Sequence, residues 1–183
     1  MQERGVSVDH ATINRGVLKY NPQLEEAFHR RKRPVWLSWR MDEMHIKVKG
    51  RWYYLYRAVD KAGQTIDFLL TEQRDEHAAT RFLTKAIRRH GGPEKVTIDG
   101  SEANAATIRS YNDEHGTAIA IRQVKYLHKI VERDHWAIKR ITRPMLGFKF
   151  FEATQCTLAG VELMHMIRKD QLESGAEQGL TAA

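Results

Sequence analysis

Cysteine is almost absent from this sequence, and so are the features that define a membrane or secreted protein. Cys156 is the only cysteine, which excludes an internal disulfide and a zinc site built from several cysteines. No apolar run approaches the ~20 residues of a membrane helix. The N-terminal stretch MQERGVSVDH has no apolar core of the kind found in signal peptides. We therefore expect a cytoplasmic protein.

Acidic residues are outnumbered by basic ones. Lys and Arg total 30 against 23 Asp and Glu, which gives a formal net charge of +7. Such an excess favours a polyanionic partner, although basicity alone does not identify one. The hydrophobic share of 42% excludes an intrinsically disordered chain, and 183 residues suit one domain with a short appendage.

The spacing of apolar residues predicts a mixed α/β protein. Period-two and β-branched patterns indicate five strands, and apolar residues at i, i+3, i+4 and i+7 indicate helices between them. The order β-β-β-α-β-α-β-α, followed by a C-terminal helix, describes a mixed sheet covered by helices. The expected strands span 36–48, 52–59, 65–71, 95–98 and 118–124, and the expected helices span 76–90, 102–115, 130–143 and 153–169.

The two ends of the chain are expected to lie outside this mixed α/β unit. Asp9 is a plausible N-cap for a short helix that ends before Asn21 and Pro22. The basic stretch that follows reads as a linker, and the residues after Asp170 read as a disordered tail. The expected division is 1–20 for an N-terminal helical segment, 21–34 for the linker, 35–170 for the core and 171–183 for the tail.

Asp42 occupies an unusual position in the first expected strand. It has the same parity as Met44, Ile46 and Val48, so it projects from an otherwise apolar face. A carboxylate there needs a cation, a metal ion or a hydrogen-bond network. An ordinary ion pair with a nearby Arg or Lys is the alternative.

Asp99 directly follows the expected strand KVTI. Ligands of open α/β sheets collect at the carboxyl ends of strands, which makes Asp99 a candidate ligand or catalytic group. The alternative is an ordinary Asp-Gly turn with Gly100.

Glu132 lies on an expected helix whose two faces separate clearly at ~100° per residue. The alternative is that the polar face of this helix, including Glu132, is simply exposed to solvent. The apolar face holds Ile130, Ala137, Ile138 and Ile141, and the polar face holds Glu132, Trp136, Lys139 and Arg143.

Three carboxylates carried by two strands and a helix meet the needs of a phosphoryl-transfer site with two metal ions. Hard oxygen ligands suit Mg²⁺, which keeps open positions for phosphate and water. Two ions ~4 Å apart activate the attacking oxygen and stabilise the leaving oxygen. Neighbouring Lys and Arg then offset the charge of the transition state.

A longer set of motifs resembles a known family. WRMDEMHIKVKGRWYYLYRAVDKAG, KVTIDGSEAN, KIVERDHWAIKR, RPMLGFK and AGVELMHMIRK occur in the order found in transposases of bacterial insertion-sequence family six. These enzymes belong to the DDE superfamily, whose catalytic domain is ribonuclease H-like. The resemblance runs from about Glu3 to about Gln171.

The resemblance assigns the acidic triad to Asp42, Asp99 and Glu132, with 32 residues between the last two. It implies two Mg²⁺ ions, for which Mn²⁺ can substitute, and no small-molecule substrate. The implied reaction is cleavage at the element's terminal repeats followed by attack of the freed 3′ hydroxyl on target DNA, carried out by a homo-oligomer in the bacterial cytoplasm. The residues expected to contact DNA are Arg133, Trp136, Lys139, Arg140 and Arg143.

Some positions depart from the family pattern. The N-terminal segment resembles only the second helix of a helix-turn-helix, and Gly16 stands where a tryptophan is expected, at a cost of ~1 kcal/mol relative to alanine in a helix. Met44 and His45 replace the usual threonine and tyrosine. His45 and His135 are not part of the family's ligand set. The alternatives are a non-catalytic DNA-binding product, shortened at its N-terminus, that interferes with full-length transposase, and a nuclease of the same fold that does not join strands.

Overall fold

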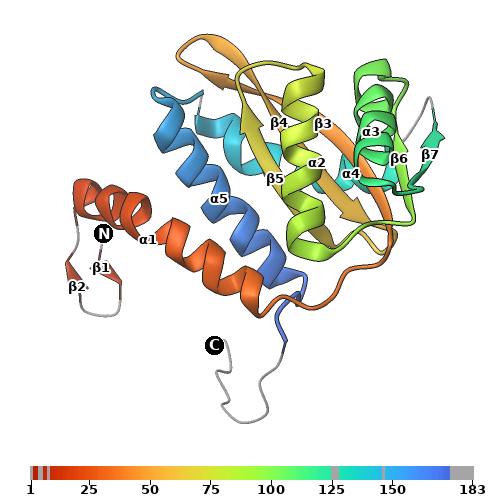
Figure 1. Ribbon diagram of the computed structural model, residues 1–183. Coiled ribbons are helices and arrows are strands. Elements are labelled where there is room, and N and C mark those ends of the chain that lie inside the picture. The colour runs from red at the N-terminus through yellow and green to blue at the C-terminus, as the bar shows by residue number, and fades with distance from the viewer. Residues whose placement is uncertain (1, 4–5, 8, 125–127, 146, 174–183) are drawn as a thin grey trace.

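A mixed sheet of five strands forms the centre of the molecule (Figure 1). The computed structural model describes residues 2–3, 6–7, 9–124, 128–145 and 147–173. The strand order is β5-β4-β3-β6-β7. β3 pairs with β4 antiparallel and with β6 parallel, as the expected fold class requires. The strands are β3 (Ser38–Val48), β4 (Arg51–Asp60), β5 (Thr65–Thr71), β6 (Lys95–Ile98) and β7 (Ala120–Gln123).

The turn between β3 and β4 fixes their register. Lys49 and Gly50 both have positive φ, at 50° and 81°, and they connect the paired residues Val48 and Arg51. Two-residue loops with positive φ at both positions match the twist of paired strands. This register places Asp42 opposite Arg57 on the same face of the sheet.

Helices cover both faces of the sheet. α2 (Glu76–His90) and α3 (Glu102–His115) bury one core with Trp39 and Met41 of β3. α4 (His128–Thr142), α5 (Phe151–Arg168) and α1 bury a second core with the even-numbered residues Met44, Ile46 and Val48. Asp42 therefore faces the layer that contains α4. A 3₁₀ turn (Arg143–Met145) follows α4.

The expected break at Asn21 and Pro22 is wrong, because α1 (His10–Arg30) is one helix with Pro22 inside it. The Asn21 side-chain amide donates to the Cys156 carbonyl at 2.7 Å. A Cβ on Gly160 would lie 2.5 Å from that amide nitrogen, so glycine permits this close approach of α1 and α5. Pro22 leaves the Leu18 carbonyl without its helical donor, and Leu18 is exposed enough for water to replace it.

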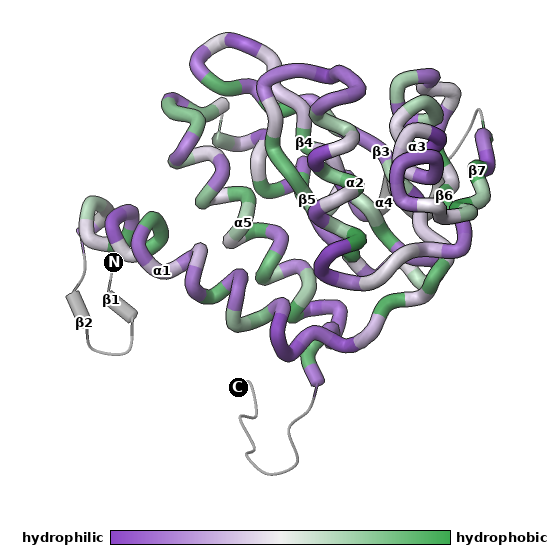
Figure 2. The backbone as a smooth tube through the Cα atoms, in the orientation of Figure 1, coloured by the Kyte–Doolittle hydropathy of each residue, from purple (hydrophilic) through white to green (hydrophobic). Residues whose placement is uncertain are grey.

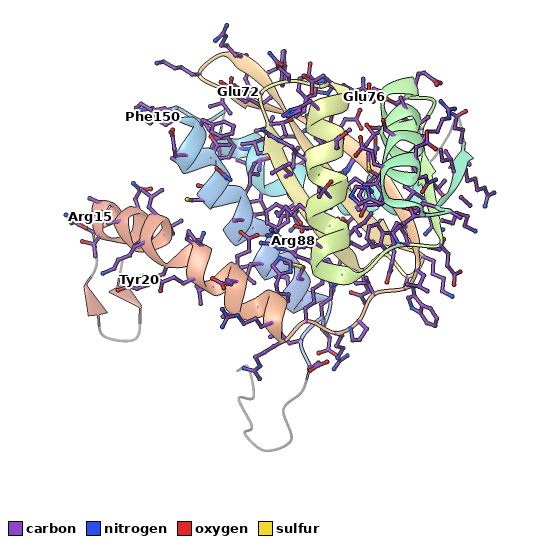
Figure 3. All side chains as sticks on the ribbon, in the orientation of Figure 1. Arg15, Tyr20, Glu72, Glu76, Arg88 and Phe150 are labelled. Carbon is purple, nitrogen blue, oxygen red and sulfur yellow. The ribbon has the colours of Figure 1, made fainter. Side chains whose placement is uncertain are left out.

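The side chains of α1 divide between these contacts and solvent. Asp9 caps the helix by accepting from the Thr12 N–H at 2.6 Å, as its sequence position indicates. Figure 2 shows hydrophilic and hydrophobic segments alternating along α1, and Figure 3 shows Arg15 and Tyr20 pointing away from the sheet. Before the helix, Gln2–Glu3 pairs with Val6–Ser7 in a small hairpin that the sequence did not indicate.

The expected linker over 21–34 and the expected tail from 171 are also corrected where the structure describes them. Lys32 is buried, and its ammonium donates to the Ile66 carbonyl at 2.5 Å. Gln171 is buried too, and its side chain accepts from the Thr65 N–H and donates to the Thr65 carbonyl. Lys32 and Leu172 form a backbone bridge, so both segments belong to the folded unit. Residues 174–183 lie outside the described part.

Candidate active site

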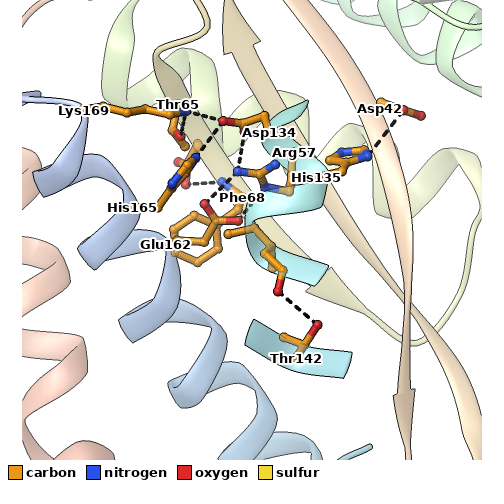
Figure 4. Close-up of polar contacts among 12 residues, drawn as sticks. Asp42, Arg57, Thr65, Phe68, Asp134, His135, Thr142, Glu162, His165 and Lys169 are labelled. Atoms are coloured by element: carbon orange, nitrogen blue, oxygen red, sulfur yellow. Dashed lines mark hydrogen bonds and ion pairs between the residues drawn. The ribbon is translucent and has the colours of Figure 1, made fainter. Parts of the chain in front are cut away.

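Asp42 lies near the middle of β3 and faces α4. One of its carboxylate oxygens accepts from the Glu43 N–H at 2.9 Å, and its side chain is 25% exposed. Arg57, opposite on β4, turns its guanidinium to Glu162 and Asp134 instead. Among the described side chains, the ion-pairing partner within reach is His135, whose Nδ1 lies 3.8 Å from an Asp42 oxygen (Figure 4).

The electrostatic setting of Asp42 disfavours its charged form. Burial raises the pKa of Asp42 to about 6, and the negative charges of Glu43 and Asp99 act in the same direction. His135 does not offset this charge, because burial lowers its pKa to about 3 and keeps it neutral near pH 7. A carboxylate in this position is stabilised by any cation that reaches it.

Asp99 directly follows β6, at the carboxyl end of the strand. One oxygen accepts from the Ser101 N–H at 2.9 Å, so the expected alternative of a local turn is partly correct. The other oxygen lies 3.8 Å from a guanidinium nitrogen of Arg74, and the side chain is 35% exposed. Asp99 thus makes a turn contact, and its negative charge acts on Asp42 by raising the pKa of that carboxyl.

Glu43 and Arg74 form a clamp beside these two carboxylates that the sequence reasoning missed. The Glu43 side chain is only 2% exposed and pairs with Arg74. Its second oxygen accepts from the Asn104 side chain at 3.2 Å. Arg74 therefore bridges Glu43 and Asp99, and it places one positive charge at the edge of the site. Glu43 follows Asp42 directly, which is the one signal the sequence offered.

Glu132 belongs to α4, but the structure does not describe the side chains of Glu132 and Arg133. The next two residues show how the helix is held against the sheet. Asp134 forms an ion pair with Arg57 at 2.5 Å, and His135 packs beside Asp42. Both residues are buried. The first turns of α4 are therefore fixed next to β3 and β4, on the side where Asp42 projects.

A buried network of ionised groups joins α4 to β4 and α5 (Figure 4). Arg57 makes a two-pronged contact with Glu162 at 2.5 and 2.9 Å. Asp134 also accepts from Lys169 and contacts His165 at 2.8 Å. Hydrogen bonds and ion pairs from these neighbours hold the pKa of Asp134 well below its usual range despite burial. Arg57 and Asp134 were absent from the sequence interpretation.

Four of the residues expected to contact DNA are at least partly exposed, namely Trp136, Lys139, Arg140 and Arg143. Trp136 is 59% exposed, and the Arg140 guanidinium lies 5.7 Å from its ring centroid. Lys139 and Arg143 line a groove next to β3. On the opposite face Ile138 is fully buried, whereas Ile141 is 37% exposed, so the expected apolar face is only partly covered.

A second group of possible metal ligands lies away from this site. One donor atom each of Glu25, His29 and Asp67 falls within 4.8 Å of the others. Asp67 is already paired with Lys85 at 3.0 Å and with Arg89 at 3.3 Å. Cations of the chain therefore balance these carboxylates, whereas the ion-pair partner of Asp42 among the described residues is the neutral His135.

The donor set around Asp42 fits a hard divalent cation. Asp42 and Asp99 offer carboxylate oxygens, which Mg²⁺ and Mn²⁺ prefer. Burial raises the pKa of Asp42, and among the described residues no Lys or Arg forms an ion pair with it. A bound divalent cation supplies a compensating charge, so the residues present agree with a metal site.

Comparison with known proteins decides the family. A family model described as a DDE domain matches residues 36–171. The chain belongs to the DDE transposase family. It is 36% identical over 182 residues to the transposase for insertion sequence-like element IS431mec of Staphylococcus aureus, covering 95% of this chain and 77% of that protein. The transposase of element IS257 in transposon Tn4003, also from S. aureus, matches at the same identity and coverage.

Solved structures agree on the ribonuclease H-like fold of this DDE transposase. The HTLV-2 integrase catalytic core in complex with magnesium aligns with a TM-score of 0.55 at 19% identity, covering 78% of this chain and 90% of that one. The BIV integrase catalytic core aligns with a TM-score of 0.51 at 16% identity, covering 67% and 79%. A chain from the structure of a simian T-cell lymphotropic virus intasome in complex with PP2A regulatory subunit B56 gamma aligns with a TM-score of 0.53 at 19% identity, covering 70% of this chain and 49% of that one.

Membership of the family fixes the class of reaction. The transposase is a polynucleotidyl transferase that cleaves DNA and transfers strands in transposition. Among the described residues, no helix has the length and apolarity needed to cross a membrane.

Proposed function

We propose that Asp42, Asp99 and Glu132 together hold two Mg²⁺ ions, for which Mn²⁺ can substitute, and that this site cuts and joins DNA at the ends of an insertion sequence. The observation that carries the proposal is the placement of Asp42 on β3 and of Asp99 directly after the neighbouring strand β6, where burial disfavours the charge of Asp42. Glu132 precedes Asp134 and His135 on α4, and these two residues contact Arg57 and Asp42. Bound metal would activate the attacking oxygen and stabilise the leaving oxygen.

The residues around the carboxylates have distinct tasks in this proposal. Arg74 balances part of the negative charge near Asp99 before substrate arrives, because it also pairs with the buried Glu43. His135 packs against Asp42 and limits the access of water to it, since His135 is only 5% exposed. A drier site strengthens the interaction of the carboxylates with any bound cation.

The positive face of α4 is proposed to hold the DNA backbone. Lys139 and Arg143 point into the groove beside β3, and Arg140 stacks near the exposed Trp136. Lys and Arg at such positions fix the register of a nucleic acid through phosphate contacts. Arg133 belongs to the same proposal by its position in the sequence.

The substrates and the assembly follow from the family. We infer that the DNA partners are the terminal repeats of the element and a target duplex, and that a homo-oligomer holds the paired ends. The N-terminal segment, including α1, is proposed to contribute to binding the ends. Its exposed side chains, Ile13, Leu18, Tyr20 and Leu24, leave an accessible surface on α1.

Strand joining tests this proposal. A pre-cleaved DNA end is incubated with a plasmid in Mg²⁺ or Mn²⁺, with the wild type, Asp99→Asn and the matched surface variant Asp113→Asn. Joined product is expected from the wild type and Asp113→Asn and is expected to disappear in Asp99→Asn. Hydrolysis without joining would indicate a nuclease. DNA binding without either reaction would indicate a non-catalytic product that interferes with active transposase.

A further inference from the structure

A groove runs along the free edge of β3, next to the catalytic carboxylates. β6 pairs with β3 only over Ser38–Arg40, at the start of the strand. At the other end, the Phe148 N–H donates to the Lys47 carbonyl at 2.9 Å. The hollow between these two contacts has a volume of about 470 Å³. Pockets for single small molecules occupy ~300–1,000 Å³, so the hollow suits one nucleotide and is too small for a duplex.

The groove combines apolar surface with positive charge. Met44, Ile46 and Phe148 contribute apolar surface, and Lys139 and Arg143 of α4 and its 3₁₀ turn contribute cations from one side. On the other side lies Lys47, and the adjoining turn adds the exposed Lys49 and Arg51. Cations around an apolar hollow match a nucleotide, which presents a flat ring system attached to a phosphate.

Trp52 supplies an aromatic ring at the rim of this groove. Its side chain is 58% exposed although it is a large hydrophobic group. The His45 ring meets it edge-on, with ring centroids 6.0 Å apart and an interplanar angle of 84°. The Lys47 ammonium lies 5.7 Å from its centroid. An indole held in this way is a platform on which a nucleobase can stack, and a neighbouring cation strengthens such contacts.

The groove begins one residue along β3 from Asp42. Glu43 lines it, and Glu43 directly follows Asp42 along β3. A DNA strand that reaches the carboxylates can therefore extend along the edge of β3 toward Trp52 without leaving the protein surface. The next nucleotide along that strand meets apolar surface, an indole and cations in turn.

We propose that this groove binds an unpaired nucleotide of the DNA substrate beside the scissile phosphate, with its base stacked on Trp52 next to His45 and its phosphate held by Lys47, Lys139 and Arg143. The proposal rests on the proposed function, because it takes DNA to be the substrate. Unpaired bases enter such pockets at the lowest cost at frayed or overhanging ends. The groove thereby favours a DNA end over an uninterrupted duplex.

Fluorescence anisotropy tests the proposal on the full chain without divalent metal. Two labelled duplexes of equal length are compared, one blunt and one with a short single-stranded thymine overhang. The wild type is expected to bind the overhang duplex more tightly. Trp52→Ala is expected to lose about 5- to 150-fold in affinity for the overhang duplex, which corresponds to ~1–3 kcal/mol of base stacking. Its affinity for the blunt duplex should change little.

Trp36→Ala is the matched control. Trp36 is 56% exposed and lies under the Lys61 ammonium at 3.6 Å, but it precedes the opposite end of β3. It should leave the preference for the overhang unchanged, and Trp52→Phe should retain part of that preference. Equal binding of both duplexes by the wild type, or a preference that survives in Trp52→Ala, would overturn the proposal.

The same samples separate this inference from the proposed function. Asp99→Asn should keep the overhang preference, because Asp99 does not line the groove. An overhang preference that depends on Trp52, in a wild-type protein that joins no strands, would support the groove and contradict the proposed function. Strand joining by a wild-type protein without any overhang preference would support the proposed function and contradict the role of the groove.

Discussion

Replacing Asp134 with asparagine should destabilise the transposase far more than a surface carboxylate change would. The side chains of Arg57, Asp134 and Glu162 are 1%, 4% and 0% exposed, so water does not replace a lost partner. The Asp134→Asn side chain keeps one acceptor but loses its charge next to Arg57, His165 and Lys169. The buried guanidinium of Arg57 then has one negatively charged partner, Glu162, in place of two.

The size of the effect follows from the contacts that remain. Breaking a buried ion pair by removing one partner costs ~3–5 kcal/mol. Arg57 keeps its two-pronged contact with Glu162, so the lower end of this range, about 3 kcal/mol, is expected. For a chain of this size each kcal/mol shifts the melting temperature by ~2–4 °C, which gives a fall of about 6–12 °C.

Urea denaturation and thermal melting measure this loss, with Asp113→Asn as the control. Asp113 is exposed on α3, so the same chemical change there should alter stability by no more than ~0.5 kcal/mol. A loss below ~1 kcal/mol in Asp134→Asn would refute the view that the network anchors α4. Glu132 lies two residues before Asp134 on α4, so loosening of this part of the helix should also displace Glu132. Strand joining by Asp134→Asn should therefore fall even at temperatures where the variant is folded.

Three further predictions concern the groove, a glycine and buried histidines. Lys139→Ala should weaken DNA binding and reduce the slope of log affinity against log salt by about 1, measured by salt titration of anisotropy, and an unchanged slope would remove Lys139 from the phosphate contacts. Gly147→Ala should lower the melting temperature, because φ is 100° there and a Cβ would lie 3.2 Å from the Lys47 carbonyl oxygen; an unchanged melting temperature would show that the segment relaxes freely. Burial lowers the pKa of His29 to about 3 and of His90 to about 4, from 6.5. Unfolding then takes up protons below pH 6.5, so stability should fall on acidification by up to ~1.4 kcal/mol per pH unit for each histidine. The double change of both histidines to glutamine should flatten that dependence in urea titrations, and an equally steep profile would contradict it.

Most of the sheet was predictable because its signals are local. β5, β6 and α3 have the bounds expected from apolar alternation, from a strand that ends at Asp99 and from helical spacing. α2 also has its expected bounds of 76–90, because Asp75 caps its start by accepting from the Ala78 N–H and Gly91 follows its last residue. Local chemistry decides such features, so the sequence alone was sufficient.

The errors come from contacts between distant segments. Asn21 and Pro22 look like a helix break, but Asn21 contacts the Cys156 carbonyl where Gly160 leaves space on α5. Lys32 looks like part of a solvated linker, yet it reaches a carbonyl of β5. Tertiary packing overrides local preference in both cases. The sequence pattern of α1 cannot predict the acceptor and the space that α5 provides for Asn21.

In the candidate site, too, the predicted residues depend on local signals and the missed residues depend on contacts between distant segments. Asp42 and Asp99 were predicted as site residues from strand parity and strand ends, which are local properties. The Glu43 and Arg74 clamp was not identified, because it joins β3 to the segment after β5. The role of Trp52 at the groove also depends on the β3 and β4 register, which places it opposite Lys47.

The most direct test of the central claim replaces the hard oxygen ligand at Asp99 with a softer sulfur ligand. Asp99→Cys is assayed for strand joining in Mg²⁺ and in Mn²⁺, beside Asp113→Cys as a surface control. Thiolate binds hard Mg²⁺ poorly and softer ions better, so joining should be lost in Mg²⁺ and restored in part by Mn²⁺ in Asp99→Cys alone. Full activity of Asp99→Cys in Mg²⁺ would contradict the assignment of Asp99 as a metal ligand.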